Sequence, residues 1–464
     1  MAKKKTEKKA AETKQVIHPV AAQTMALLRQ DRSLADWKVS QTTQETYQLH
    51  VSKKARIEDA IAGMRDTIQA TVYVRTKQGL GESSFLLATT KKVDMKKAIR
   101  EAKLLALHVE QDAFELPKGG KNQLPMVILD DAELLAARRD GRVNALLNAT
   151  KEEIITEFKR LQDVRLSSME LHASFISHHL WTSTHIDMKS TGTRVYLEMV
   201  ITAKKGRREQ EYTPSLEVRR LADLDIKRNI KEWTAIARDV AKSKRPKPYL
   251  GAVVISSDAL VAFFAPHLSE NPLVTHASAK LAHMGLSRYK QNEDVAKEYI
   301  DGDRITIISN PLLNYNIGST LYDEDGVPAR KLALIKDGRF KSFIAPKKYA
   351  DYLKISPSGP LGAIEVLPGS ASEKELLKGM HGAKGVYEIV SFSSFVPNDI
   401  SGDFAAEIRL GYYHKDGKKI PLKGGMLSGN LFELASHWLL SKETMQKPGY
   451  AGPTTLYLPE ASIF

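Results

Sequence analysis

The histidines are the first side chains to test for chemistry, because the chain has 13 of them and no cysteine. The lack of cysteine excludes a thiol nucleophile, a disulfide framework and a zinc site with a sulfur ligand. If His276 and His283 lay on one helix they would share a face, but the helical rise would separate them by roughly 10.5 Å, too far for one zinc ion. His178 and His179 are adjacent and in a strand would point to opposite faces. These spacings predict no metal site.

Two glycine-containing motifs near the carboxyl end could bind or transform a ligand. Ser428, Gly429 and Asn430 precede a predicted helix, where free backbone N–H groups could meet a phosphate or a carboxylate. The same residues suit a tight turn and a helix N-cap, which we favour. Gly402 and Asp403 stand in the sequence SGDF, where the aspartate could be catalytic or the pair could form a turn. We favour the turn, so no catalytic residue is assigned and all five residues are candidates for a peptide cleft.

An acidic run, Asp323 to Asp325, could hold a cation. Gly326 and Pro328 follow it directly, and that composition is more typical of a hairpin tip. Asp337 and Gly338 give a second hairpin signal between alternating segments. We therefore expect two hairpins here and no cation site.

The composition indicates a globular protein of 464 residues, with 42% hydrophobic and 27% charged residues and a mean hydropathy of −0.32. No run approaches the length of about 18 apolar residues that a spanning helix needs. We expect no membrane association and a cytoplasmic location. The net charge is +14, but the basic clusters carry no interleaved aromatic residues, so a nucleic-acid partner is not expected.

The hydrophobic pattern divides the chain into a tail and two halves. Residues 1–18 are polar and lysine-rich without apolar periodicity, and we expect a disordered basic tail. Residues 19–245 mix helical and alternating patterns, which predicts an N-terminal α/β domain with a turn at 189–192 joining two strands. Prolines mark a boundary near residue 246, and residues 246–464 are rich in predicted strands. The predicted fold class is α+β, with a strand-rich C-terminal domain.

Three motifs follow one another in the second half: LYDEDGVPARKLALIKDGRFKSFI, then SGDFAAEIRLGYY, then GKKIPLKGGMLSGNLFELA. Their order and spacing resemble the TldD/PmbA (TldE) family of peptidase-related proteins. The first half fits this family more loosely, through segments such as STHIDMKSTGTRVYLEMVITA. The resemblance covers nearly the whole chain except the tail.

The resemblance also shows a departure from the proteolytic members of the family. Proteins similar to TldD carry a helical HExxxH motif, with histidine ligands and a glutamate base, and a distant cysteine as a further ligand. The matching segment here reads FAPHLSEN, so His267 survives, Leu268 stands at the glutamate position and Asn271 stands where we place the second histidine. The cysteine's neighbourhood reads Gly449 to Gly452, without sulfur. The chain therefore resembles the PmbA/TldE branch without the metal motif, with His267 as a weak metal candidate.

Three functions follow from this resemblance. The first is a subunit without metal or cofactor that joins a TldD-like catalytic partner, which alone would hold zinc, and contributes strand edges for an unfolded or extended peptide. The second is a self-standing homodimer that binds peptides or another ligand without hydrolysis. The third is a metalloprotease with divergent ligands around His267. We expect the first, and we expect the single chain to be inactive.

Overall fold

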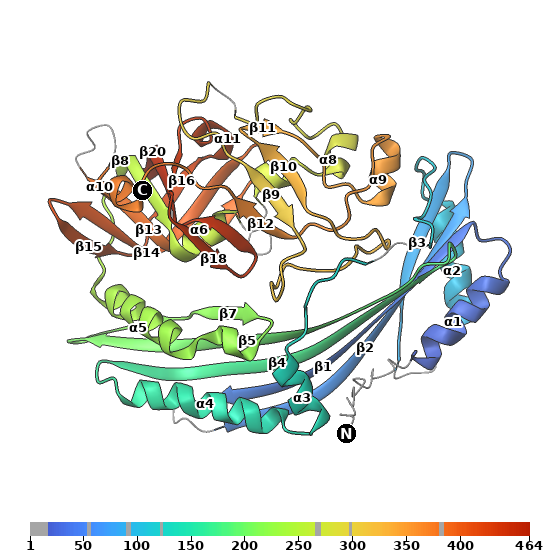
Figure 1. The fold of residues 1–464 in the computed structure, drawn as a ribbon, viewed down its shortest axis with the longest axis horizontal. Coiled ribbons are helices and arrows are strands. Elements are labelled where there is room, and N and C mark those ends of the chain that lie inside the picture. The colour runs from blue at the N-terminus through green and yellow to red at the C-terminus, as the bar shows by residue number, and fades with distance from the viewer. Residues whose placement is uncertain are drawn as a thin grey trace, which may run out of the picture. The chain divides into compact units, whose positions relative to one another are not determined.

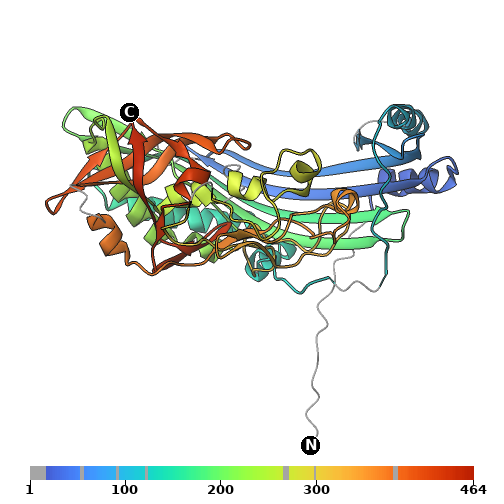
Figure 2. The same ribbon diagram turned by 90° about the horizontal axis from the view of Figure 1, so that it is seen from above.

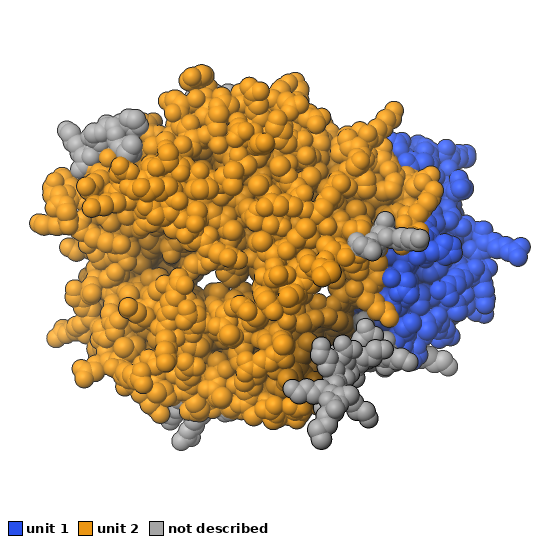
Figure 3. All heavy atoms as spheres, viewed as in Figure 1, with its two compact units in different colours: residues 1–42, 66–113, 179–187 blue, residues 43–65, 114–178, 188–464 orange. Residues whose placement is uncertain are grey.

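The computed structural model describes residues 17–52, 57–89, 94–120, 124–264, 271–296, 299–379 and 385–464. Contacts group the chain into two compact units (Figure 3). Unit 1 comprises residues 1–42, 66–113 and 179–187, and unit 2 comprises residues 43–65, 114–178 and 188–464. The bounds of these units differ from the domain boundary that the sequence predicts near residue 246. That boundary stays a prediction. The expected tail lies outside the described residues apart from its last two positions.

Helices and extensive sheets make up the chain, so the predicted α+β class is confirmed (Figures 1 and 2). The first sheet has the strand order β3-β2-β1-β4-β5-β6, with β7 paired to β5. Its bounds are β1 (Asp36–Val51), β2 (Ile57–Arg75), β3 (Leu80–Leu87), β4 (Val164–Thr182), β5 (Asp187–Lys205), β6 (Arg208–Tyr212) and β7 (Ser215–Val218). No helix of the described residues has the length and apolar character that crossing a membrane requires.

The predicted turn at 189–192 is wrong, because these residues lie inside β5 and the chain turns at 183–186 instead. At that turn, the Ile186 N–H donates to Thr182 Oγ1 at 3.1 Å. Gly192 serves a different purpose, since a Cβ there would lie 2.6 Å from the Arg219 guanidinium. A glycine that makes room for a distant side chain has the same appearance in a sequence as a turn glycine.

Unit 1 has its own apolar core. Helix α1 (Pro19–Gln30) begins after His18, whose Nδ1 accepts the Val20 N–H, and α2 (Met95–Leu107) begins after the N-cap Asp94. The helices bury Leu28 and Ile99 against strand residues of the same unit. Both helices therefore present an apolar side to the core of unit 1.

In unit 2, helices cover one face of the first sheet. These are α3 (Ala132–Arg139), α4 (Val143–Lys159) and α5 (Ile226–Lys242), the last preceded by the 3-10 turn η1 (Leu221–Leu224). Side chains such as Ile154 and Trp233 pack on Leu171 and Leu197 of the sheet. Residues alternate between faces along a strand, so the neighbours of Leu171 and Leu197 lie on the opposite face, which these helices do not cover.

Two further sheets form the strand-rich part of unit 2. The second has the order β11-β10-β9-β12-β19-β18, with β9 (Ile307–Asn310), β10 (Leu332–Lys336), β11 (Arg339–Phe340), β12 (Ala363–Val366), β18 (Thr444–Lys447) and β19 (Tyr450–Pro453). The third has the order β13-β8-β20-β16-β14-β15, with β17 paired to β20 and β13 also paired to β14. Its bounds are β8 (Tyr249–Ser256), β13 (Val386–Pro397), β14 (Asp403–Lys415), β15 (Lys418–Leu422), β16 (Met426–Asn430), β17 (Leu439–Leu440) and β20 (Thr455–Ile463).

The pairing of β13 with β14 closes the third sheet into a ring of β13, β8, β20, β16 and β14. Large apolar side chains such as Phe263, Phe264 and Trp438 belong to the core of this region. Short helices complete it: α6 (Ser257–Phe264), α7 (Pro272–Thr275), α8 (Ala279–His283), α9 (Lys347–Tyr352), α10 (Glu373–Lys378) and α11 (Leu431–Leu434).

The two hairpin predictions have different outcomes. Asp337 and Gly338 form the two-residue turn between β10 and β11, both with positive φ, so this hairpin is confirmed. At Asp325 and Gly326 the chain makes a turn closed by an isolated bridge between Tyr322 and Pro328, without flanking strands. The turn is present, but the alternating residues around it do not pair as a hairpin.

Candidate functional site

Strand pairing brings together the residues that the sequence suggested near the carboxyl end. Asp403 lies opposite Asn430 in the ladder between β14 and β16. Ser428 and Gly429 precede Asn430 on the same strand. The predicted turn at 428–430 is therefore wrong, because the alternating backbone pairs with β14 as strand β16. The predicted N-cap is confirmed at Asn430, whose Oδ1 accepts the Phe432 N–H at 3.0 Å.

These residues are used to hold the chain together. Asn430 Nδ2 donates to Asp403 Oδ1 at 2.8 Å and to the Ser401 carbonyl at 2.9 Å. Ser401 Oγ donates to Asp403 Oδ2 at 2.7 Å. Gly402 has a φ of +82°, and a Cβ there would lie 2.4 Å from the Phe432 ring. The geometry describes a strand junction, with both carboxylate oxygens of Asp403 accepting hydrogen bonds.

The segment matched to the metal motif offers few ligands. His267 and Leu268 lie outside the described residues. Asn271 is fully buried, its Nδ2 donates to the Phe263 carbonyl and its Oδ1 accepts the Leu273 N–H at 2.8 Å. The amide is thus committed to capping α7.

The spacing of the metal motif also needs a correction. The second histidine of HExxxH stands five positions after the first, so counting from His267 it falls on Pro272, not on Asn271. Proline has no side-chain donor for a metal. At the cysteine's neighbourhood, Tyr450 is buried in β19 and donates to the Pro453 carbonyl at 3.0 Å. The donor set in the described part of this region does not fit a catalytic zinc ion.

His276 and His283, the pair whose spacing was tested for a metal site, do not come together as ligands. His276 is buried, accepts the Arg288 N–H on Nδ1 at 3.0 Å and bonds the Ile400 carbonyl through Nε2 at 3.1 Å. Burial lowers its pKa. His283 lies on α8, separate from His276 at the end of α7. Within the described ranges, no three or more histidine, aspartate and glutamate side chains are placed to hold a metal ion.

A cleft of about 460 Å³ lies elsewhere in unit 2, between segments that are far apart in the sequence. Residues 216–218 of β7, residues 314–317 of a loop and residues 446–448 at the end of β18 line it, together with η1 and the start of α5. We call it the edge cleft, because β7 and β18 both lie at the edge of a sheet. Among the described strands, β7 pairs only with β5, and β18 pairs only with β19. Two strand edges therefore border one cavity.

The free edge of β7 can be assigned from its hydrogen bonds. The Met199 N–H of β5 donates to the Pro214 carbonyl at 3.0 Å. Bonded and non-bonded pairs alternate along an antiparallel ladder, so Leu216 is also bonded to β5. Ser215 and Glu217 then turn their N–H and C=O groups away from β5, toward the open edge.

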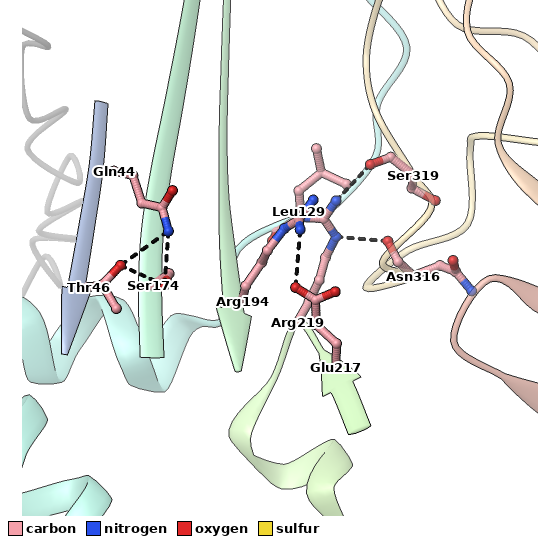
Figure 4. Close-up of polar contacts among 9 residues, drawn as sticks. All are labelled: Gln44, Thr46, Leu129, Ser174, Arg194, Glu217, Arg219, Asn316 and Ser319. Atoms are coloured by element: carbon pink, nitrogen blue, oxygen red, sulfur yellow. Dashed lines mark hydrogen bonds and ion pairs between the residues drawn. The ribbon is translucent and has the colours of Figure 1, made fainter. Parts of the chain in front are cut away.

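Arg219 fixes one wall of the edge cleft (Figure 4). Its Nε donates to the Asn316 carbonyl at 2.8 Å and its Nη2 to the Ser319 carbonyl at 2.7 Å. The side chain is 6% exposed, and burial lowers its pKa to about 10. This arginine ties the end of β7 to the loop, and Gly192 leaves the space that its guanidinium fills.

Several other charges in the edge cleft are paired. The Arg220 guanidinium lies 4.2 Å from the centre of the Tyr315 ring and bonds both carboxylate oxygens of Asp223 at 2.6 and 2.9 Å. Lys447 is 3.6 Å from Asp258. The cleft therefore offers backbone groups and paired charges, which suits a polypeptide better than a small anion. Apart from the three asparagines in NPLLNYN, no local pattern in the sequence indicated this cleft.

Comparisons with known proteins agree with this fold. Residues 253–463 match the family model described as the PmbA/TldA metallopeptidase C-terminal domain. An uncharacterised protein of Methanocaldococcus jannaschii is 30% identical over 169 residues, which is 35% of this chain and 41% of that protein, so less than half of that relative is covered. A zinc metalloprotease TldD homolog of Saccharolobus solfataricus is 20% identical over 331 residues, covering 66% of this chain and 72% of the homolog.

Two solved structures share the fold over almost the whole chain. TldE of Thermococcus kodakarensis has a TM-score of 0.74 at 17% identity and covers 95% of this chain and 99% of its own. A Thermotoga maritima protein, named as a candidate modulator of a DNA gyrase, has a TM-score of 0.75 at 18% identity and covers 96% and 99%. Residues 253–463 therefore carry the C-terminal domain of the metallopeptidase-related PmbA/TldD family, and the chain as a whole has the fold of TldE.

Proposed function

We propose that this chain is a PmbA/TldE-like subunit that holds unfolded or extended peptides for a TldD-like metalloprotease partner. The observation that supports this most is the edge cleft, where two strand edges border one cavity. An extended peptide that adds to such an edge gains main-chain hydrogen bonds, which depend little on its sequence. This fits a subunit whose substrates are defined by being unfolded.

The proposed lack of a metal in this chain is supported by the segment 264–272. Asn271 uses its amide as a helix cap, and Pro272, at the spacing of the second histidine, has no donor. Leu268 stands at the glutamate position, so this chain has no base there to activate water. Zinc and the base would both come from the partner.

Peptide binding tests the role of the edge cleft. A labelled, unstructured twelve-residue peptide is titrated against the full chain by fluorescence anisotropy, beside a copy N-methylated at alternate residues, which cannot donate to a strand edge. We expect the methylated copy to bind at least about tenfold more weakly, because several main-chain hydrogen bonds are lost. Equal affinity of the two peptides would contradict pairing at an edge.

A pair of variants at Glu217 assigns the binding to β7. Glu217→Pro removes the outward N–H at an edge position where proline is tolerated, and Glu217→Gln changes the same side chain but keeps the N–H. We expect weaker peptide binding for the proline variant and near-normal binding for the glutamine variant. Loss in both would assign the effect to the side chain.

Proteolysis tests the partnership. The single chain, the mixture with a TldD-like protein that carries HExxxH, and the mixture with that protein's motif glutamate replaced are incubated with casein. We expect cleavage in the intact mixture alone and a complex of both chains on size exclusion. A stable homodimer that ignores the TldD-like protein would favour the self-standing binding protein. Chelator-sensitive cleavage by the single chain, lost on His267→Ala, would favour the metalloprotease.

A further inference from the structure

Four polar side chains gather on the face of the first sheet that is opposite α4 and α5. Glu170 and His172 lie on β4, and Tyr196 and Glu198 lie on β5. Their neighbours along the strands, such as Leu171 and Leu197, are fully buried under the helices, whereas these four are partly exposed. All four belong to unit 2, and we call them the cation cage for the reasons below.

Short contacts connect the four groups. Tyr196 Oη donates to Glu198 Oε2 at 2.7 Å, and the Tyr196 and His172 rings lie 5.5 Å apart, tilted by 47°. His172 Nε2 is 3.5 Å from Glu170 Oε2, yet this nitrogen is shielded from solvent and has no hydrogen-bond partner among the described residues. Burial lowers the pKa of His172 and raises the pKa of Tyr196 to about 12, so neither ring is charged at neutral pH.

Among the described residues, no basic side chain is paired with the two carboxylates of the cation cage. In the described part of the chain no lysine or arginine forms an ion pair with Glu170 or Glu198, whereas Glu217 on the neighbouring strand pairs with Arg194 at 3.1 Å. This is unexpected in a chain with a net charge of +14. Two carboxylates beside two neutral aromatic rings are the groups that recognise an organic cation.

We propose that the cation cage binds the ammonium or guanidinium group of a lysine or arginine in the peptide held by the edge cleft. This inference rests on the proposed function. It adds a substrate preference, for extended peptides with a basic residue, to a cleft that otherwise recognises the main chain.

The position of β7 connects the cage to the edge cleft. In the register of β5 and β7, Tyr196 lies opposite Glu217 and Glu198 lies opposite Ser215, so these side chains share one face. A peptide added to the free edge of β7 would run about 10 Å from β5, two strand spacings away. Every second side chain of the peptide would lie on the face of the cage, and a long lysine or arginine side chain can extend across β7.

A metal ion fits the cage less well than an organic cation. His172 Nε2 and Glu170 Oε2 are 3.5 Å apart, but within the described ranges no group of three such ligands is placed to hold a metal. Aromatic rings add attraction for an ammonium or guanidinium group, which is spread over several atoms.

The first experiment compares four labelled twelve-residue peptides that differ at one central position, which is lysine, arginine, glutamine or glutamate. Affinities for the full chain are measured by fluorescence anisotropy at low salt. We expect the lysine and arginine peptides to bind about tenfold more tightly than the glutamine peptide, as one charge-assisted contact predicts, and the glutamate peptide to bind most weakly.

Two matched double variants locate the preference. Glu170→Gln with Glu198→Gln removes the charge of the cage, and Glu152→Gln with Glu153→Gln removes the same charge from exposed positions on α4. The preference for lysine should fall below about twofold in the first variant and persist in the second. A preference that survives in the cage variant would assign it to the overall field of the protein and overturn the inference.

A second measurement does not depend on peptide binding. N-acetyl-lysine methylamide, magnesium and zinc are each titrated against the His172 imidazole resonance, assigned with His172→Gln. The lysine compound should shift the resonance in the wild-type chain and not in the cage variant. If every peptide fails to bind but this shift occurs, the proposed function fails and the cage stands.

The opposite combination is equally informative. If the lysine and glutamine peptides bind equally well, the cage fails and the proposed peptide-holding function stands. No shift with the lysine compound, or a shift with a metal ion alone, also overturns the cation cage.

Discussion

The buried carboxyl of Asp323 makes the stability of the chain depend on pH in a direction opposite to that of most carboxyl groups. Its Oδ1 accepts the backbone N–H groups of Asp325 at 3.0 Å and Val327 at 2.8 Å. Its Oδ2 is shielded from solvent and has no hydrogen-bond partner among the described residues. Burial raises the pKa of Asp323 from 3.8 to about 6, and the nearby charge of Asp325 contributes in the same direction.

The sign of the effect follows from this raised pKa. The folded chain holds this proton more tightly than the unfolded chain, so the contribution of Asp323 to stability is fully present below pH 3.8 and is lost as the pH rises through about 6. The difference between about 6 and 3.8, at about 1.36 kcal/mol per pH unit, corresponds to a loss of about 3 kcal/mol above pH 6.

Asp323→Asn removes this dependence while keeping the size and the Oδ1 acceptor. Its Nδ2 would itself lack a partner, at a cost of about 1 to 3 kcal/mol at every pH. The free energy of unfolding of the variant, relative to the wild type, should therefore increase by about 2 to 2.5 kcal/mol between pH 4 and pH 7.5, because part of the full difference is already lost at pH 4. Near pH 7.5 the variant should be as stable as the wild type or more stable.

Urea denaturation at a series of pH values, followed by circular dichroism, measures the difference. Glu324→Gln, which removes the same charge from the exposed neighbouring position, is the control and should show a much smaller pH dependence. A difference between Asp323→Asn and wild type that stays constant from pH 4 to pH 7.5 would refute the argument, because it would show that the carboxyl is solvated in the folded chain.

Three further predictions concern the edge cleft, the strand junction and the metal. Arg219→Met should lower the free energy of unfolding, measured by calorimetry, by about 3 kcal/mol or more, because the buried carbonyl groups of Asn316 and Ser319 lose their donor. The control Arg220→Met should lower it less, because the Arg220 side chain is more exposed. Gly402→Ala should be more destabilising in thermal melts than Gly424→Ala, by about 1 kcal/mol or more. Both glycines have positive φ, but of the two only Gly402 would place its new Cβ against an aromatic ring. Equal losses of stability in the two variants would mean that backbone strain accounts for both. The purified chain should contain no stoichiometric zinc by elemental analysis, and one zinc per chain that is lost on His267→Ala would contradict this.

Local patterns predicted local structure well. The dipeptide Asp337-Gly338 identified the two-residue turn between β10 and β11, because such a turn depends on neighbours within a few positions. The turn at 189–192 failed for the opposite reason. Gly192 makes room for the side chain of Arg219, which directly follows β7 and leaves no mark on the sequence around the glycine.

The candidate sites show the same limit. The motifs at 401–403 and 428–430 were candidates for a peptide cleft, and in the structure their side chains form a junction between β14 and β16. The edge cleft combines segments near residues 217, 315 and 447, and no local pattern shows that these segments meet. The cation cage was also missed, because an alternating strand with Glu170 and His172 is an ordinary pattern for one exposed face.

The closed ring of strands in unit 2 has a consequence for the order in which the chain can fold. Strand β20, residues 455–463, lies between β8 and β16, so the ring has a gap until these residues are available. During synthesis, β8 would wait through about 200 further residues for this neighbour, which at about 5 to 20 residues per second is about 10 to 40 seconds. Over that interval the apolar side chains of β8 lack their cover, and a chaperone that shields nascent strands would be most useful then. A ribosome stalled before residue 455 should carry a chain whose second half is open to protease, whereas one stalled well beyond residue 463 should not.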